Sequence, residues 1–419
     1  MESGRKKRQS FAANLFLIVI SVLVTILIAE GGTRLFYYIR WNGHLYKLNG
    51  LEYSLRLGWM TSPGLYTEFQ INDQNFRRPQ NIPLVPPSGT IRIMLVGGST
   101  AFGANGLYPQ FEPKPLRYED TIDYQLEAML AAENGGVRFE VINAAVSEYR
   151  LFQEITLFQD KLVNFRPDLV IFLDGHNDIS FLTGVSALTH DGTPYWSSRH
   201  FDRGQRVLND TSVLAPLNYL DLYLGRVSYF YHGLSRLFQH YQDVRALTEP
   251  GSGTGPWGEG IFKLEDEKLL LQKYKDRLGQ VDQALPLYVQ FVHDLKALAA
   301  SRHISVVYML QPEIVVESPS DLSAKEAQIQ QFAFQHHHEF GTLAWRHLTG
   351  KLASSLDDLS NAQFQFIDST VISKNESEDL YTDYCHLTAR GNRVIAQRLY
   401  PVVVALAGMQ PAAPKANGL

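Results

Sequence analysis

A serine follows directly on an apolar run that ends in two glycines. In the sequence IRIMLVGGSTAFG, residues 91–96 are typical of a short buried strand, and Gly97 and Gly98 predict a tight turn. Ser99 is therefore expected at the carboxyl end of a strand, the edge of a parallel sheet where ligands bind. Such a serine could act as a nucleophile. The same residues also fit an ordinary turn with Ser99 as a helix N-cap.

An asparagine has the same position after another predicted strand. Residues 168–173, DLVIFL, are apolar after the first residue, and DGHND follows them. Asn177 is thus expected at the same sheet edge as Ser99. A side-chain amide is a neutral donor and suits an oxyanion hole, whereas the alternative is a loop residue that caps the next helix. His176 either lines the site or is only a loop residue.

Asp383 and His386 form an Asp-x-x-His sequence just before the last predicted helix. Across one turn of backbone, the carboxylate can accept the imidazole Nδ1 proton and leave Nε2 free to take a proton from a serine hydroxyl. One loop would then supply both a base and the group that orients it. We expect the adjacent Cys385 to be a packed small residue, because neighbours in sequence need not face each other.

Strands and helices alternate around these residues. The pattern predicts an α/β fold with three layers, in which a parallel sheet carries helices on both faces. The predicted strands are 91–96, 137–143, 168–173, 304–310 and 364–367, and the predicted helices are 121–132, 151–165, 264–302, 323–354 and 388–406.

Composition and isolated motifs exclude several other functions. A net charge of -5 argues against a nucleic-acid partner, and the single cysteine excludes an intrachain disulfide. The consecutive histidines 336–338 favour a solvated helical face over a metal site, because neighbours on a helix point to different sides. No metal is therefore expected at these residues.

The chain is predicted to start with a membrane anchor. Residues 11–29 contain no charge, follow a basic segment at 1–10, and are long enough to cross a bilayer. A cleavable signal peptide is the alternative, although its apolar region is normally only about 7–15 residues. The basic segment favours a cytoplasmic N-terminus, so the rest of this single-pass protein is expected on the periplasmic or extracellular side.

Composition divides the rest of the chain into segments. Residues 30–89 are predicted to be a juxtamembrane collar, 90–407 the α/β domain, and 408–419 a disordered tail. An aromatic and turn-rich insertion at 181–263 interrupts the domain. It is either a lid or substrate wall, or a small helical subdomain whose aromatic residues form a core.

As a set, these motifs resemble the SGNH hydrolase superfamily, also called GDSL-type esterases and lipases. The resemblance covers residues 90–406 and extends loosely upstream to 72–77, in the manner of membrane-anchored bacterial members. It implies a flavodoxin-like fold in which Ser99 is the nucleophile, His386 the base and Asp383 its orienting partner. Asn177 and the backbone N–H of Ser99 would be oxyanion donors. The resemblance implies no cofactor.

The second sequence block of that family departs from its pattern here. The family has an asparagine followed five residues later by a glycine whose backbone N–H is an oxyanion donor, but Asn143 is followed by Glu148 at that place. The N–H of Glu148 can still donate. A positive φ there is costly for any residue but glycine, and the carboxylate would repel an oxyanion unless it turns to solvent. Loss of one donor typically lowers kcat by about 10² to 10³.

The function expected from these observations is that of a membrane-anchored serine esterase. Its partner would be an ester-bearing small molecule or glycan, for instance O-acetyl groups on an envelope or extracellular polysaccharide. One alternative is an O-acyltransferase that uses the same acyl-enzyme. The other is a non-catalytic glycan-binding or assembly protein on the same fold, which the departure at Glu148 would favour.

Overall fold

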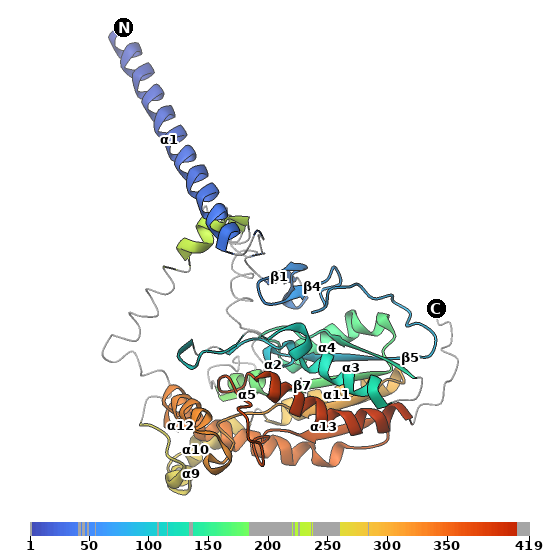
Figure 1. Cartoon of the computed structure of the whole chain (residues 1–419). Coiled ribbons are helices and arrows are strands. Elements are labelled where there is room, and N and C mark those ends of the chain that lie inside the picture. Colours follow the sequence, from blue (N-terminus) through green and yellow to red (C-terminus); the bar gives the residue numbers. More distant parts are fainter. Residues whose placement is uncertain are drawn as a thin grey trace. The chain divides into compact units, whose positions relative to one another are not determined.

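The structure of the chain is a computed structural model (Figure 1). It describes residues 2–40, 50–183 and 260–408 with gaps at 55, 107–108, 115, 134–136 and 284, and separate positions at 43, 47 and between 220 and 237. Two compact units are present. The first comprises Met1–Gly50, Gly64–Thr67 and Arg203–Gly253, and the second comprises Leu51–Pro63, Glu68–Asp202 and Thr254–Leu419.

A parallel sheet of five strands forms the centre of the second unit, in the order β6-β5-β7-β8-β9 (Figure 1). Its strands are β5 (Thr90–Gly97), β6 (Arg138–Asn143), β7 (Leu169–Asp174), β8 (Ser305–Leu310) and β9 (Phe364–Asp368). Every neighbouring pair is parallel. In β5, which lies between β6 and β7, Leu95 pairs with Asn143 of β6 and Ile171 of β7. The predicted parallel sheet is therefore confirmed.

Helices cover both faces of this sheet. α3 (Ile122–Glu133) packs against α13 (Ala389–Gly408) on one face, while α11 (Leu285–Ser301) contacts α4 (Leu151–Asp160) and α12 (Ala324–Leu356) on the other. After β5 the chain forms β6 on one side of β5, and then crosses to form β7 on the other side of β5. The connections at the carboxyl ends of β5 and β7 thus run to opposite faces, which leaves a crevice for a ligand between them.

Three predicted helices are interrupted. The stretch predicted as one helix at 264–302 consists of η5 (Leu264–Asp266), α9 (Glu267–Lys273), α10 (Lys275–Asp282) and α11. Pro286, at the second position of α11, lacks the N–H that a continuing helix needs but fits a first turn. The helix predicted at 151–165 is shorter in the structure. It ends at Asp160 as α4, and the 3-10 helix η3 (Leu162–Phe165) follows it. α12 is broken at His338, which has φ 56° and ψ -179°.

Residues 51–89 belong largely to the second unit. β1 (Leu51–Ser54) pairs antiparallel with β2 (Gly58–Thr61), and β4 (Gln70–Ile71) follows. Trp59 and Phe76 are buried. The predicted collar at 30–89 is therefore divided between the two units, because side chains after residue 50 such as Trp59 and Phe76 pack into a core.

The first unit contains α1 (Glu2–Arg40) and β3 (Gly64–Leu65). Within Ala13–Arg40 of α1, the most apolar stretch has a mean hydropathy of 2.5, and none of it is buried. By length and composition, this helix fits a membrane anchor or a signal sequence. Most of the predicted insertion at 181–263, and residues 409–419 of the predicted tail, lie outside the described residues.

Candidate active site

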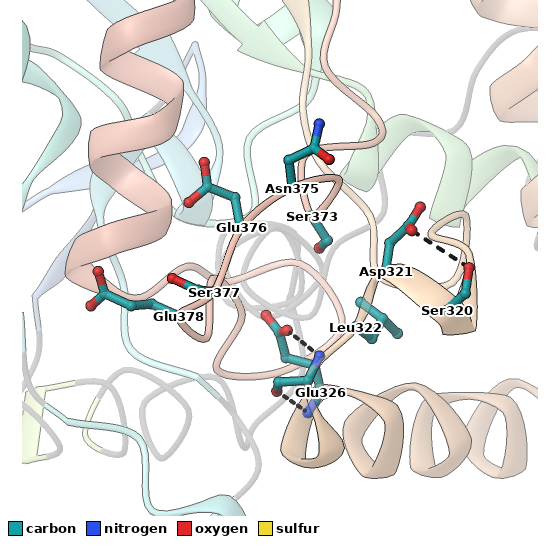
Figure 2. Close-up of a pocket in the computed structure, with 10 residues that line it drawn as sticks. Ser320, Asp321, Leu322, Glu326, Ser373, Asn375, Glu376, Ser377 and Glu378 are labelled. Carbon is teal, nitrogen blue, oxygen red and sulfur yellow. Dashed lines mark hydrogen bonds between the residues drawn. The ribbon is translucent and has the colours of Figure 1, made fainter.

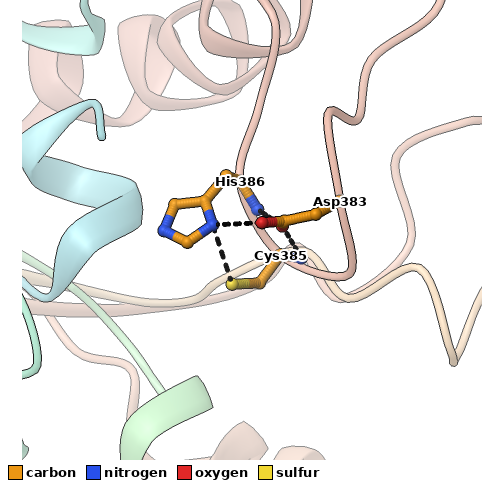
Figure 3. Close-up of side chains that lie close together, drawn as sticks. All are labelled: Asp383, Cys385 and His386. Carbon is orange, nitrogen blue, oxygen red and sulfur yellow. Dashed lines mark hydrogen bonds and ion pairs between the residues drawn. The ribbon is translucent and has the colours of Figure 1, made fainter. Parts of the chain in front are cut away.

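The Asp383–His386 pair is buried in the loop before α13. His386 Nδ1 lies 2.8 Å from Asp383 Oδ2, and Asp383 Oδ1 accepts the backbone N–H groups of Cys385 at 2.9 Å and His386 at 2.8 Å. Figure 3 shows Nδ1 facing the carboxylate and the other ring nitrogen facing away from it. A carboxylate that accepts backbone N–H groups favours its charged form. The pair thus has the geometry of a base and its orienting anion.

Cys385 completes a cluster with these two side chains, but the distances do not fit a metal. Their possible ligand atoms lie within 4.8 Å of one another. A tetrahedral ion about 2.0 to 2.3 Å from each ligand would hold the ligand atoms more than about 3 Å apart, whereas Nδ1 and Oδ2 are at hydrogen-bond distance. Burial, and next the nearby Asp383, raise the pKa of the Cys385 thiol well above its usual value. Cys385 is thus a buried, protonated thiol, in line with its predicted packing role.

Ser99 is the first residue of α2 (Ser99–Phe102), directly after β5. Gly97 has φ 155°, and a Cβ on it would lie 2.4 Å from the carbonyl oxygen of Leu173 and 2.6 Å from the Cβ of Ala101. Only glycine fits so close to the backbone of the neighbouring strand. The turn brings Ser99, which is half-buried, to the sheet edge at which it was predicted.

The serine turn and the Asp383–His386 loop are joined through neighbouring residues. Thr100 Oγ1 donates to the carbonyl of Cys385 at 3.2 Å, and Gln311 Nε2 donates to Thr100 Oγ1 at 3.2 Å. No hydrogen bond joins the side chains of Ser99 and His386 themselves in the described part of the chain. In free enzymes such bonds are often formed only when substrate binds.

Asn177 lies at the second position of α5 (His176–Thr183), immediately after β7. Its Nδ2 donates to the carbonyl of Tyr149 at 2.8 Å. The same atom would lie 2.5 Å from a Cβ on Gly98, so the amide packs against the turn that carries Ser99. Since an amide has two donor hydrogens, one remains for a substrate oxygen.

Glu148 occupies a β-turn beside that asparagine. The N–H of Tyr149 donates to the carbonyl of Val146 at 3.1 Å, and Glu148, at the third position of the turn, has φ 66°. The sequence had indicated a positive φ here. The side chain of Glu148 is exposed, which places its carboxylate where water screens the charge. The backbone turn thus keeps its form without glycine.

Two residues from the segment before β5 support these turns, and the sequence patterns did not single out either one. Trp59 Nε1 donates to the carbonyl of Ser147 at 3.0 Å, and the hydroxyl of Tyr149 donates to the carbonyl of Trp59 at 2.6 Å. The buried Arg77 donates to the carbonyls of Phe102 and, at 2.6 Å, Gly103, at the end of α2. The upstream likeness at 72–77 was the only signal for Arg77.

A second buried imidazole–carboxyl pair lies beside the first. His176 Nδ1 and Glu313 Oε1 are 2.6 Å apart, and Gln311 Nε2 donates to the same carboxyl at 3.4 Å. Burial, and next the charge of Asp383, raise the pKa of Glu313 well above its usual value. Burial, and next His386, lower the pKa of His176 to about 3. These shifts point to a neutral acid and a neutral imidazole that share one proton.

Aromatic rings surround His176. The ring of Tyr384 stacks on it at 5.0 Å between centroids, and that of Trp345 lies 4.7 Å away. The break in α12 places His337 5.5 Å from Trp345 and 5.6 Å from Tyr384. The prediction of one continuous solvated helical face for the three histidines is therefore corrected at His337, because the break at His338 changes the direction of the chain.

Figure 2 shows a polar pocket of about 240 Å³ between the start of α12 and the loop after β9. None of the predicted catalytic residues lines it. Glu326, on its wall, accepts the backbone N–H groups of Leu380 at 2.6 Å and Tyr381 at 3.1 Å, and it caps α12 together with Ser323. Through these hydrogen bonds, Glu326 thus connects the start of α12 to the beginning of the loop that contains Asp383.

No family model and no curated protein matches the chain. Solved structures that resemble it include an acetyl xylan esterase, with 12% identity over 75% of this chain and 100% of that chain, at a TM-score of 0.35. A lipolytic protein of the G-D-S-L family from Veillonella parvula has 11% identity over 75% and 98%, at 0.34. A catalytic mutant of an acetylxylan esterase from Geobacillus stearothermophilus has 9% identity over 75% and 94%, at 0.35. One of them is thus of the G-D-S-L family, which the sequence motifs of this chain also resemble.

Proposed function

We propose that this protein is a serine esterase of the SGNH type, with Ser99 as nucleophile, His386 as base and Asp383 as its orienting anion. The observation that carries this proposal is the buried pair in which Asp383 holds His386 through Nδ1, in a loop hydrogen-bonded to the residue after Ser99. Such a pair beside an accessible hydroxyl at a sheet edge is suited to acyl transfer.

In the proposed reaction, Ser99 Oγ attacks the ester carbonyl while His386 Nε2 takes the hydroxyl proton. The oxyanion accepts hydrogen bonds from the Asn177 amide and the backbone N–H groups of Ser99 and Glu148. When the tetrahedral intermediate collapses, Nε2 returns the proton to the leaving alkoxide. Water then attacks the acyl-enzyme with the same base, which releases the acid and restores the serine.

We further propose an exported active site, with the N-terminus in the cytoplasm and α1 as the anchor. An O-acetyl group on an envelope or extracellular glycan is the proposed ester. The apolar, unburied α1 and the many aromatic residues in the sequence of the insertion at 181–263, which can stack on sugars, support this substrate. The exposed side chain of Glu148 removes the main reason to favour a non-catalytic binding protein.

The first test is the intact mass of the full chain in detergent after incubation with a fluorophosphonate. We expect one covalent adduct on the wild-type protein and none on Ser99→Ala. A folded wild-type protein that stays unlabelled would contradict the proposal.

The substrate class is tested separately with acetylated xylo-oligosaccharides and long-chain lipid esters. Release of acetate is expected from the first, and cleavage of lipid esters alone would overturn the glycan proposal. Adding an acceptor sugar and analysing the products separates hydrolysis from transfer.

A further inference from the structure

A group of apolar side chains is exposed in the first unit, within residues 220–237. Leu220, Tyr223, Val227, Leu234 and Leu237 have exposed fractions of 48%, 62%, 40%, 49% and 68%. Leu220, Tyr223 and Val227 lie three and four residues apart, and after the non-helical Ser228, Leu234 and Leu237 lie three apart, which are spacings expected for helices with an apolar side. Exposed apolar side chains so close together in sequence indicate a surface that contacts something other than water.

The carboxylate of Glu30 in α1 binds this segment through hydrogen bonds. It accepts the Ser228 hydroxyl at 2.7 Å and the backbone N–H groups of Tyr229 at 3.1 Å and Phe230 at 3.0 Å. Ser228 Oγ in turn accepts the N–H of Tyr231 at 3.0 Å. Residues 229–235 are helical, so these are N–H groups of a first turn, which lack partners within their own helix. Figure 1 shows this yellow-green helix beside the C-terminal end of α1.

Arg34, one turn along α1, adds a second set of contacts. Its Nε donates to Glu30 at 2.6 Å, and one terminal nitrogen donates to the carbonyl of Val227 at 2.6 Å. The guanidinium lies 4.8 Å from the ring centre of Tyr229, and the ring of Tyr37 lies 5.7 Å from the same ring. Residues nearly 200 positions apart are therefore held at one end of α1.

Because Glu30 directly follows the predicted membrane span, its position indicates the level in the bilayer at which this segment lies. The predicted span at 11–29 has 19 residues, which at about 1.5 Å per residue cover roughly the 30 Å of a bilayer core. Glu30 and Arg34 then lie at the level of the headgroups. Exposed leucine and tyrosine side chains at that level can enter the boundary between headgroups and acyl chains.

We infer that the described residues between 220 and 237 form an interfacial segment that Glu30 and Arg34 hold against α1 and that inserts its exposed apolar side chains into the same bilayer. Its partner is a phospholipid surface, because Glu30 and Arg34 hold these exposed side chains at the end of the unburied apolar span of α1. The protein is thus attached to the membrane by two segments far apart in sequence. This inference rests on the proposed membrane insertion of α1 and not on the proposed chemistry at Ser99.

Three leucines with the same exposed fraction of 68% allow a matched test: Leu237 in the segment, Leu27 in α1 and Leu269 in α9. Each is replaced by cysteine in the full chain, labelled with bimane and reconstituted into vesicles of phosphatidylcholine and phosphatidylglycerol with brominated acyl chains. The wild-type chain, whose only cysteine is buried, is the labelling blank. We expect quenching at position 237 to be at least half as strong as at 27, and position 269 serves as the reference for an equally exposed leucine of the second unit.

Each outcome of that test decides the inference. Quenching at 27 without quenching at 237 overturns it while α1 remains a membrane span. Absence of quenching at both positions overturns the inference together with the proposed anchor, whatever the esterase assays show. Lipid-independent disulfide dimers of unlabelled Leu237→Cys would identify a second copy of the chain as the partner and would also overturn it.

The role of Glu30 is tested with Glu30→Ala in the Leu237→Cys background. Loss of the carboxylate leaves the first-turn N–H groups without their acceptor, so we expect quenching at 237 to fall while quenching at 27 is unchanged. Unchanged quenching at 237 would contradict the assigned fastening role of Glu30.

Discussion

Two buried pairs at the same sheet edge join a carboxyl oxygen to the Nδ1 of an imidazole. The Asp383–His386 pair has a distance of 2.8 Å, and the Glu313–His176 pair one of 2.6 Å. The two pairs differ in the other hydrogen bonds that the carboxyl group accepts. Asp383 also accepts two backbone N–H groups, whereas Oε2 of Glu313 has no hydrogen-bond partner within the described part of the structure.

This difference shows that residue types alone do not set the charge of such a pair. Backbone donors stabilise the anionic form of Asp383, while burial without them raises the pKa of Glu313 and favours its neutral form. The Asp-x-x-His turn supplies its own donors because the chain folds back over the carboxylate. The Glu313–His176 pair joins the loop after β8 to the start of α5, and among the described residues neither segment supplies such backbone donors to the carboxyl group of Glu313.

The largest expected effect distinguishes the two carboxyl groups. Asp383→Asn should lower kcat on a soluble ester by about 10⁴, as the wrong imidazole tautomer is then favoured. Glu313→Gln should cause a much smaller loss, because it replaces one neutral group by another. Steady-state kinetics and the rate of fluorophosphonate labelling measure both, with melting temperatures as the control for folding. Equal losses would show that both carboxyl groups act on the reaction.

Asn177 and His176 are adjacent in sequence and allow a second comparison. Asn177→Ala should lower kcat by about 10² to 10³, since one oxyanion donor is lost. His176→Asn, which keeps a polar atom near the position of Nδ1, should lower kcat less. If the His176 variant were as impaired as the Asn177 variant, the second pair would act on the chemistry directly.

The second pair should also shape how stability depends on pH. The pKa of His176 is about 3 in the folded chain, below its ordinary 6.5, so the unfolded chain binds more protons between these values. The contribution of neutral His176 to the free energy of unfolding is thus fully present above pH 6.5. It falls by up to about 1.4 kcal/mol per pH unit as the pH drops below that value. Denaturant unfolding at pH 7, 6 and 5 should show a shallower fall for His176→Phe.

Glu313 should act in the opposite direction. Because its pKa is raised in the folded chain, its unfavourable contribution appears as the pH rises above the ordinary value of 4.5. As the pH rises above 4.5, the free energy of unfolding of Glu313→Gln should therefore fall less than that of the wild type. Parallel curves for both variants and the wild type would argue against neutral forms of this pair.

The smallest effect is expected at Glu148, which belongs to neither pair. Glu148→Gly should relieve the cost of φ 66° and raise the stability by up to about 1 kcal/mol, with the entropy of glycine offsetting part of the gain. Because the exposed carboxylate is screened, kcat should change little. Melting temperature and kcat measure both effects. A large rise in kcat would show that the carboxylate opposes the oxyanion.

The sequence by itself determined the strands of the sheet, the positions of Ser99 and Asn177 at its edge, and the local Asp-x-x-His pairing of Asp383 with His386. Apolar runs followed by glycine, or by a polar loop, are local patterns, and in a parallel sheet each such run ends at the same edge. The positive φ of Glu148 was also indicated locally, by the family pattern. The catalytic roles of these residues remain a proposal.

Only the tertiary structure decided which distant segments support the site. His176 and Glu313 are 137 residues apart, and Trp59 and Ser147 are 88 apart. No local pattern records such pairs, because the order of strands in the sheet decides which loops become neighbours. The protonation of Glu313 depends on the same packing, since the donors around a buried carboxyl group set its charge.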